Sequence, residues 1–343
     1  MNESAIQILA KTSKGIKNAA WVFDEAVTSS EFMHLPQQQQ ILSDRFDHLS
    51  LAQSHHLDLK LCSYEDLANQ LPNECRDFFI RVSKSRSLTR HWINCLSEAL
   101  PIGGRLHIAG GKKEGTRNYI DGARKLLNDN SAHIHHKNIL QASLTKQKHI
   151  TSTLVDKNFT ELVNVTDGEL NFQTRPGIFG WNKIDKGSRL LVDTVRSNAL
   201  IQDNNNVLDL GCGYGYLSIA LAQVVDASFT ATDNHLTALS VCQSNFDNLG
   251  IRGVTLADNC GDSINKKYDL VVCNPPFHTG FSVDDSLLSR FLHTASVCLE
   301  ISGEAVFVVN SFIDLPQIAQ QYFSDCERLI AADGFSVYQL QQS

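Results

Sequence analysis

The sequence has no apolar run long enough to span a membrane and no Cys-x-x-Cys pair. A membrane helix needs roughly 18–20 consecutive apolar residues, and no such stretch occurs among the 343 residues. The first fifteen residues, MNESAIQILAKTSKG, contain no apolar core of the kind that a signal peptide requires. We therefore expect a cytoplasmic protein that has no membrane partner.

The nine cysteines are odd in number and scattered singly along the chain. A disulfide framework needs paired cysteines, and a structural zinc site needs closely spaced Cys or His ligands. Neither pattern is present, so we expect reduced thiols inside a hydrophobic core and no bound metal.

The net charge of −7 argues against a nucleic-acid partner when it is taken over the whole chain. Residues 1–155 nevertheless hold 19 Lys and Arg against 15 Asp and Glu, whereas residues 156–343 hold 11 against 22. Ten of the thirteen histidines also lie in the first half. This asymmetry predicts that the N-terminal half makes the main contacts with any polyanionic partner.

The second half alternates between short apolar runs and segments with helical spacing. This alternation predicts a parallel β-sheet that is covered by helices on both faces. A hairpin is predicted at its end, turning at Asp333-Gly334. The predicted strands are 207–211, 227–233, 254–258, 268–273 and 304–310, and the predicted helices are 217–225, 236–250 and 285–300.

The first half contains an incomplete copy of the second. DFFIRV (77–82) resembles DLVVCN (269–274), and the segment 88–110 resembles 287–309. The first copy has no early glycine-rich turn. Because 343 residues exceed one ordinary core, we expect two tandem α/β domains, 1–155 and 156–343, that arose by duplication.

The strongest local signal is LDLGCGYGYLS, residues 208–218, in which a strand, a Gly-x-Gly-x-Gly turn and a helix follow one another. Gly211, Gly213 and Gly215 predict a loop that a ligand can approach closely. Asp233 ends the next strand, where a carboxylate can hold both hydroxyls of a ribose. Asp209 would repel a phosphate but suits a cationic ligand, such as the amino and sulfonium groups of S-adenosylmethionine.

Two further strand ends face the same predicted crevice. Asn259 follows the third strand, where its side chain could reach the edge of an adenine. The segment NPPF follows the fourth strand. The side-chain carbonyl of Asn274 and the peptide carbonyl of Pro275 could accept hydrogen bonds from an aromatic amine during methyl transfer, and the rigid prolines would keep both carbonyls in position. Phe277 could stack on a flat base.

LDLGCGYG together with NPPFH resembles the class I S-adenosylmethionine-dependent methyltransferases that act on planar amines, and most closely the bacterial ribosomal RNA guanine-N2 methyltransferases. The preceding segment PGIFGWNKIDKGSRLL is similar to a segment of that family at Pro176, Gly177, Phe179, Asp185 and Gly187. Gly180 departs from the family, which usually has Ser at this position.

The resemblance implies two Rossmann-like class I methyltransferase domains, of which the N-terminal one is degenerate and binds RNA. It also implies an enzyme that transfers a methyl group from S-adenosylmethionine to N2 of a guanine in 16S rRNA. The partner would be 16S rRNA or the small ribosomal subunit, and we expect a monomer. The alternatives are a 23S rRNA guanine-N2 methyltransferase, a protein glutamine-N5 methyltransferase and a non-catalytic RNA-binding or chaperone protein.

Overall fold

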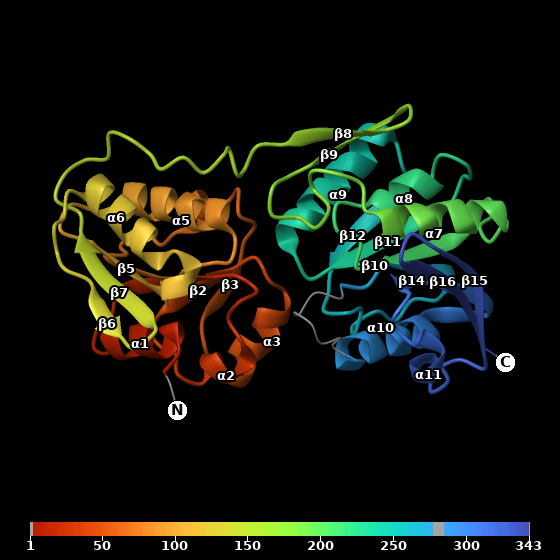
Figure 1. Ribbon diagram of the computed structural model, residues 1–343, viewed down its shortest axis with the longest axis horizontal. Helices are drawn as coiled ribbons and strands as arrows, with labels where there is room; N and C mark the ends of the chain where they lie inside the picture. Colours follow the sequence, from red (N-terminus) through yellow and green to blue (C-terminus); the bar gives the residue numbers. More distant parts are fainter. Residues whose placement is uncertain (1–2, 277–284, 343) are drawn as a thin grey trace. The chain divides into compact units, whose positions relative to one another are not determined.

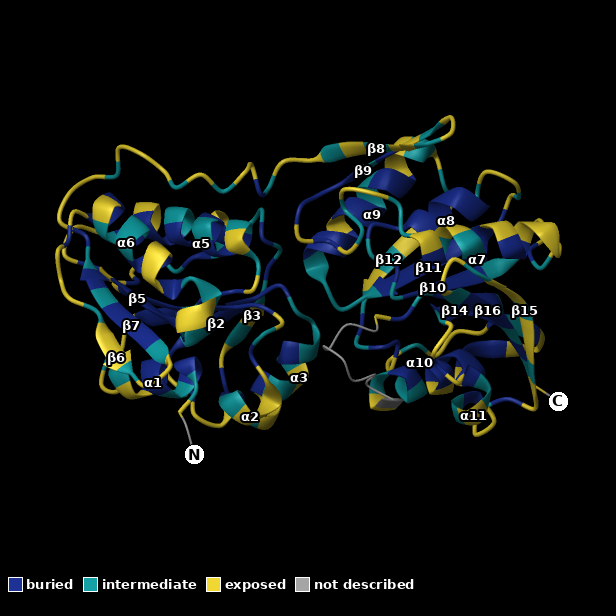
Figure 2. Ribbon diagram, in the orientation of Figure 1, coloured by how far each residue is buried: buried dark blue, intermediate teal, exposed yellow. Residues whose placement is uncertain are grey.

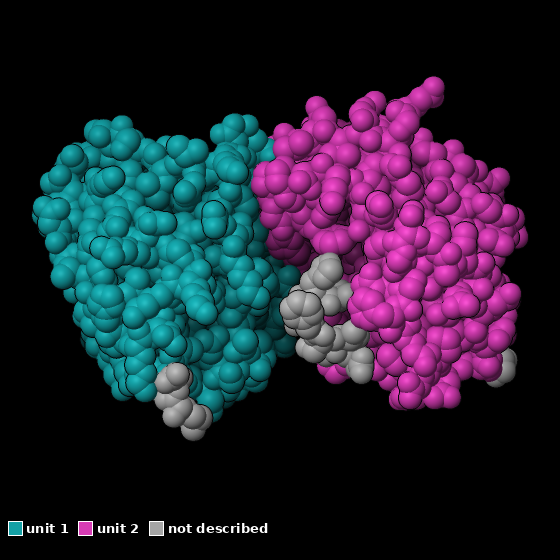
Figure 3. Space-filling model, viewed as in Figure 1, with its two compact units in different colours: residues 1–161 teal, residues 162–343 magenta. Residues whose placement is uncertain are grey.

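A computed structural model describes residues 3–276 and 285–342 of the protein. The chain divides into two compact units, Met1–Glu161 and Leu162–Ser343 (Figure 3). Each unit is built on a seven-stranded sheet, and the second unit carries an additional two-stranded hairpin (Figure 1).

Unit 1 begins with a helix and continues as alternating strands and helices. Its strands are β1 Ala19–Phe23, β2 Gln40–Ser43, β3 Leu59–Leu61, β4 Asp77–Arg81, β5 Arg105–Gly111, β6 Ile134–His136 and β7 Ile139–Thr145. Its helices are α1 Ala5–Thr12, α2 Ser29–Phe32, α3 Asp47–Ser54, α4 Leu67–Gln70, α5 Arg86–Ala99, η1 Lys112–Glu114 and α6 Thr116–Leu127.

Unit 2 repeats this arrangement after a hairpin. Its strands are β8 Val163–Asp167, β9 Leu170–Thr174, β10 Asn206–Leu210, β11 Ser228–Asp233, β12 Gly253–Ala257, β13 Tyr268–Cys273, β14 Leu299–Asn310, β15 Asp325–Ala332 and β16 Phe335–Gln341. Its helices are α7 Lys186–Ser197, α8 Tyr216–Leu221, α9 Leu236–Leu249, α10 Asp285–Cys298 and α11 Leu315–Ala319.

The two large sheets have the same topology. The strand order is β3-β2-β1-β4-β5-β7-β6 in unit 1 and β12-β11-β10-β13-β14-β16-β15 in unit 2. In both sheets the first five strands pair in parallel, and the last two strands in the order join through antiparallel pairings. The predicted fold of two tandem α/β domains is therefore confirmed, and the identical strand order supports the predicted duplication.

The sheet of unit 2 is buried on both faces, as Figure 2 shows for its dark central strands. Along β13, Leu270 and Val272 pack into the core that α7, α8 and α9 cover, whereas Val271 and Cys273 pack into the core under α10 and α11. This alternation follows from the two-residue period of a strand. It explains why continuous apolar runs form these strands.

Two predicted boundaries of helices and strands differ from the structure by more than two residues. Helix α8 ends at Leu221 instead of residue 225. The backbone N–H groups of Gln223 and Val224 donate to the carbonyl oxygens of Ala220 and Leu221, three residues earlier, so the chain continues as a 3₁₀-type turn. Strand β14 begins at Leu299 instead of residue 304, because an irregularity opposite Tyr268 lets the extra residues join the sheet. The hairpin at Asp333-Gly334 is confirmed by the pairing of β15 with β16.

None of the helices in residues 3–276 and 285–342 combines the length and apolar character that crossing a membrane requires. In the same residues, no cluster of three or more His, Cys, Asp or Glu side chains could hold a metal ion.

Candidate active site

The glycine-rich loop of unit 2 connects β10 to α8. Gly211, Gly213 and Gly215 all have positive φ, at +81°, +55° and +90°. These are backbone angles that side chains larger than hydrogen disfavour. A Cβ atom at residue 215 would also lie 2.6 Å from Sγ of Cys242. The loop therefore needs glycine for its shape. It lies at the carboxyl edge of the sheet, where the N–H groups of Gly211 and Cys212 bond the carbonyl oxygen of Thr232.

Asp233 lies beside this loop, at the end of β11. One carboxylate oxygen accepts the N–H of Gly213 and the other accepts the N–H of His235, each at 2.9 Å. A carboxylate oxygen has room for two hydrogen bonds, so the half-buried Asp233 keeps acceptor capacity for the hydroxyls of a ribose. Its position fits the predicted role in binding S-adenosylmethionine.

Asp209 lies beneath the loop and is completely buried. Its Oδ2 accepts hydrogen bonds from the backbone N–H of Ser218 at 3.1 Å and from the Ser218 hydroxyl at 2.7 Å. Its Oδ1 is buried and has no partner in the described part of the chain. Burial raises the pKa of Asp209 to about 6, although the bonds from Ser218 oppose the shift. Asp209 thus anchors the start of α8, and its direct contact with a ligand stays a prediction.

The end of β12 presents two polar side chains with different environments. Asp258 is buried, and its carboxylate accepts the N–H of Ser263 at 3.2 Å and also the Ser263 hydroxyl. Asn259 is half-buried, and its side-chain oxygen has only a weak 3.8 Å contact from the thiol of Cys260. The side chain of Asn259 is therefore less constrained than that of Asp258, and its predicted contact with a ligand stays a prediction.

Asn274 follows β13 and is held by two side chains from the start of α7. Its amide nitrogen donates to Oδ2 of Asp185 at 3.0 Å and to Oγ of Ser188 at 2.8 Å. Because a carboxylate only accepts hydrogen bonds, these contacts require the NH2 group to face α7. The amide oxygen of Asn274 is thereby turned away from α7. Pro275 is buried behind it, and Phe277 and His278 lie outside the described residues.

A small pocket joins this corner to the glycine loop. The predicted residues that line it are Gly211, Gly213 and Asn274. Asp209, Gly215, Asp233, Asn259 and Pro275 do not line it. The other lining residues are Phe179, Ser188, Cys212, Tyr214, Tyr216 and Leu217.

Sequence reasoning identifies Asp185 only as a match to the family segment and does not single out Ser188, yet the structure places both beside Asn274. Asp185 is the N-cap of α7 and accepts the N–H of Ser188 at 2.9 Å. The spacing Asp-x-x-Ser before a helix could have predicted this cap. It could not have predicted the contact with Asn274, which is 89 residues away in sequence.

The β8–β9 hairpin packs against the outer side of the glycine loop. The ring of Phe172 stacks on Tyr214 at 5.5 Å between centroids. At the hairpin tip, Asp167 accepts hydrogen bonds from the hydroxyl of Tyr216 at 2.7 Å and from Arg189 at 2.6 Å. These contacts hold both tyrosines of the sequence GYGY in place around the loop.

Known proteins are similar to this chain in sequence and in fold. The model of the family described as methyltransferase small domain matches residues 169–339. The ribosomal RNA small subunit methyltransferase C of Pseudomonas aeruginosa (strain LESB58) is 29% identical over 267 residues, which cover 76% of this chain and 77% of that protein. The protein of the same name from Buchnera aphidicola subsp. Acyrthosiphon pisum is 27% identical over 80% of this chain and 78% of its own.

Unit 2 of the chain is a methyltransferase small domain. The predicted resemblance to the bacterial ribosomal RNA methyltransferases is confirmed by these relatives. Among solved structures, a T. thermophilus 16S rRNA N2 G1207 methyltransferase in complex with AdoMet and guanosine matches with a TM-score of 0.83. It covers 99% of this chain and 92% of its own at 20% identity, and so supports the two-domain fold of this small-domain methyltransferase.

The raised pKa of Asp209 predicts how stability depends on pH. Between its ordinary value of 3.8 and about 6, the folded protein keeps a proton on Asp209 that the unfolded chain has lost. The contribution of Asp209 to the free energy of unfolding therefore falls as the pH rises through this range. Asp209→Asn removes the titration and keeps an oxygen acceptor for Ser218. As the pH is raised from 4 to 7, we expect the free energy of unfolding of the variant to rise by about 2–3 kcal/mol relative to that of wild type.

Urea denaturation of the full-length proteins at several pH values measures this difference. Asp262→Asn provides a control, since Asp262 is exposed and its replacement removes the same charge. Parallel stability curves for the Asp209 variant and wild type would contradict the prediction.

Proposed function

We propose that the protein transfers a methyl group from S-adenosylmethionine to the exocyclic N2 of a guanine in 16S rRNA. The observation that carries this proposal is the amide of Asn274, whose NH2 group is held by Asp185 and Ser188 beside the glycine loop. A hydrogen-bond acceptor fixed in this way suits a substrate that presents an NH2 group. The relatives that span three quarters of the chain are named for methylation of small-subunit ribosomal RNA.

The proposed cofactor site consists of Asp209, Gly211, Gly213, Gly215, Asp233 and Asn259. Asp233 holds the ribose hydroxyls, Asn259 contacts the adenine edge, and the glycines let the cofactor approach the backbone. The carboxylate of Asp209 adds negative charge beneath a cationic ligand. When bound, S-adenosylmethionine supplies an electrophilic methyl group on its sulfonium.

The proposed catalytic residues are Asn274, Pro275 and Phe277. The carbonyl oxygens of Asn274 and Pro275 accept the two N–H groups of the guanine amine. This draws the nitrogen lone pair out of conjugation with the ring as the new bond forms. Phe277 stacks on the base, which has to leave its helix before N2 can be reached in line. Because the product amine loses its extra proton to water, no general base is required.

The direct test is methylation of purified RNA and ribosomal subunits. The full-length protein is incubated with labelled S-adenosylmethionine and either small-subunit or large-subunit particles, and the digested RNA is examined by mass spectrometry. We expect N2-methylguanosine at one site in 16S rRNA. Label in 23S rRNA alone, in ribosomal protein alone or nowhere would contradict the proposal.

The catalytic prediction concerns Asn274. Asn274→Ala removes an acceptor that matters most when the amine gains positive charge, so we expect kcat to fall about 100-fold or more, with little change in cofactor affinity. Ser188→Ala removes one of the two groups that orient the amide, and we expect a smaller loss in kcat. Single-turnover methylation with saturating RNA and cofactor measures both effects.

Asn248→Ala is the matched control, because Asn248 is an exposed amide on α9 of the same unit. Its rate should equal that of wild type. A wild-type rate for Asn274→Ala would mean that the Asn-Pro-Pro corner is only a turn.

We further propose that unit 1 binds RNA and has no cofactor. The glycine loop of unit 2 is replaced after β1 by Asp24-Glu25-Ala26, in which Asp24 accepts the N–H of Ala26 at 3.1 Å. The segment after β4 corresponds to the Asn-Pro-Pro corner after β13 in unit 2. In unit 1 this segment carries two exposed basic residues, Lys84 and Arg86. Their place at the carboxyl edge of the sheet suits contacts with phosphate groups.

The salt dependence of RNA binding tests this surface. Arg90 also lies near it, but its guanidinium donates to the carbonyl oxygen of Val155 at 2.8 Å, so we leave it unchanged. Replacing Lys84 and Arg86 by Ala should lower the slope of log K against log salt by about 1.5–2. The control replaces the exposed Lys14 and Lys17, which removes the same charge from the opposite edge of the sheet. Equal slopes for the two double variants would contradict the proposal.

A further inference from the structure

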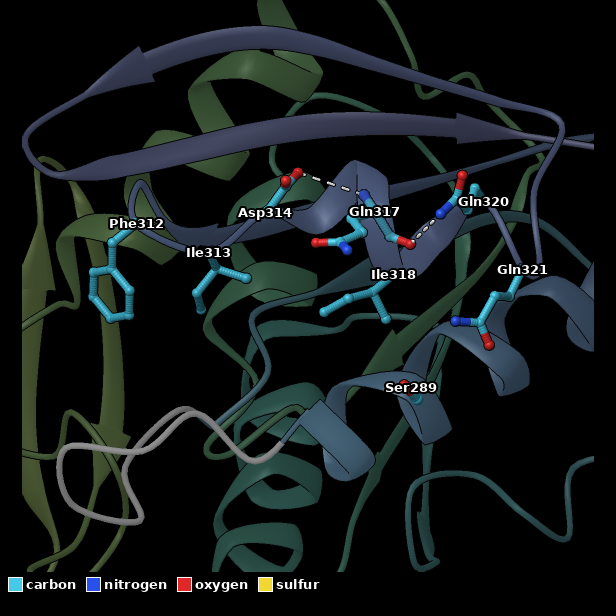
Figure 4. Close-up of a pocket in the computed structure, with 8 residues that line it drawn as sticks. All are labelled: Ser289, Phe312, Ile313, Asp314, Gln317, Ile318, Gln320 and Gln321. Atoms are coloured by element: carbon cyan, nitrogen blue, oxygen red, sulfur yellow. Dashed lines mark hydrogen bonds between the residues drawn. The ribbon is translucent and has the colours of Figure 1, made fainter.

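A second hollow of unit 2 lies between helix α10 and the segment that leads from β14 into α11 (Figure 4). Phe312 stands at one end of this hollow and Gln321 at the other, and Gln317 and Ile318 lie between them. Ser289 faces these residues from α10. The lining residues are Ser289, Phe312, Ile313, Asp314, Gln317, Ile318, Gln320 and Gln321.

The topology places this hollow near the Asn-Pro-Pro corner. Strands β13 and β14 are parallel neighbours, and Cys273 pairs with Phe307. Asn274 is the next residue after Cys273, and Phe312 lies five residues beyond Phe307. Strand β14 ends at Asn310, and the chain then turns, with the N–H of Ile313 bonding the carbonyl oxygen of Asn310. Asn274 and Phe312 therefore follow neighbouring strands at the same edge of the sheet, with Cα atoms at most roughly 15 Å apart. A nucleotide close to the target guanine in a single strand can span this separation.

The side chains in the hollow match the chemistry of a nucleobase. Phe312 is 75% exposed and offers a flat face for stacking. The side-chain amides of Gln317 and Gln321 have no hydrogen-bond partner in the described residues, and each provides both donors and an acceptor. Asp314 adds an acceptor, since its carboxylate makes only a long 3.5 Å contact with the N–H of Gln317.

The charges around the hollow exclude a phosphate as its main ligand. None of the described residues that line it is Lys or Arg, whereas Asp314 is acidic. An anion would meet a carboxylate without a cation to compensate for it. An uncharged ring with polar edges is not repelled by the carboxylate and needs no cation. Proteins bind unpaired RNA bases of this kind through stacking and through hydrogen bonds to the edges of the base.

We propose that this hollow holds an unpaired base of the RNA substrate, close in sequence to the methylated guanine. Phe312 stacks on the ring of that base, and Gln317 and Gln321 bond its edges. The inference rests on the proposed function, because it requires an RNA strand whose target guanine lies at Asn274. The base in the hollow would help the enzyme to distinguish its own site from other guanines.

The test combines a protein series with an RNA series. Phe312→Ala and Gln317→Ala are compared with wild type and with Ile301→Ala. Ile301 is 92% exposed near the start of β14, the strand that precedes Phe312, so Ile301→Ala controls for the loss of an exposed apolar side chain. The RNA is a 16S rRNA fragment that carries a single abasic nucleotide at each position flanking the methylated guanine. The full-length proteins are used, with kcat/KM for methylation and cofactor affinity by calorimetry as readouts.

We expect Phe312→Ala to lower kcat/KM on intact RNA by about 5- to 100-fold, the range for loss of one base–aromatic stack. Gln317→Ala should give a smaller loss, and Ile301→Ala should match wild type. One abasic position should lower the wild-type value by a similar factor. On that RNA, Phe312→Ala should cause little further loss, because both changes remove the same contact.

Several results would overturn the inference. The first is a kcat/KM for Phe312→Ala that equals that of wild type. The second is a loss in kcat/KM for Phe312→Ala on the abasic RNA that is as large as its loss on intact RNA, because the two changes would then act independently. The third is a loss of cofactor affinity in Phe312→Ala. In each case, methylation of intact RNA by wild type would leave the proposed function standing. Absence of methylation by wild type, both on this RNA and on small ribosomal subunits, would instead contradict the proposed function itself.

Discussion

The parallel pairing of β10, β11, β13 and β14 is the constraint on which the site of unit 2 depends. Parallel strands have their carboxyl ends at one edge of a sheet, so the residues that follow them share one crevice. The glycine loop, Asp233 and Asn274 come from three separate stretches of the chain, yet all lie at this edge. The apolar residues that alternate along the strands hold this pairing in register, since a shift by one residue would exchange the two cores.

The comparison of the two units separates the requirements of the fold from those of the site. Both sheets have the same strand order, and both have helices packed against the two faces. The loops at the carboxyl edge differ: a glycine loop follows β10, whereas Asp24-Glu25-Ala26 follows β1. A sheet tolerates such exchanges because loops contribute few core contacts. Chemistry can therefore be lost from one copy while its framework persists.

Helix α7 and the β8–β9 hairpin complete the site of unit 2 from outside the sheet. Helix α7 supplies Asp185 and Ser188, which orient the amide of Asn274. The hairpin contacts the glycine loop through Phe172 and through the side chain of Asn245, which bonds the backbone of Gln173 and the carbonyl of Tyr214. Both elements precede the glycine loop in sequence. The segment before the loop that resembles the family thus contacts the Asn-Pro-Pro corner through the first turn of α7.

The sequence alone determined the α/β class, the duplication and most strands of unit 2, because these follow from local periodicity and from the two-residue alternation of buried strands. It also placed the glycines, Asp233 and Asn274 at the ends of strands, because each of them directly ends or follows a predicted strand in the sequence. Only the tertiary structure decided how Asn274 is oriented, since its partners Asp185 and Ser188 are 89 and 86 residues away. The same holds for Asp209, whose burial beneath the loop and contact with Ser218 depend on how α8 packs on β10. Hydrogen bonds between distant segments carry no periodic signal in a sequence, and they form only when the sheet brings those segments together.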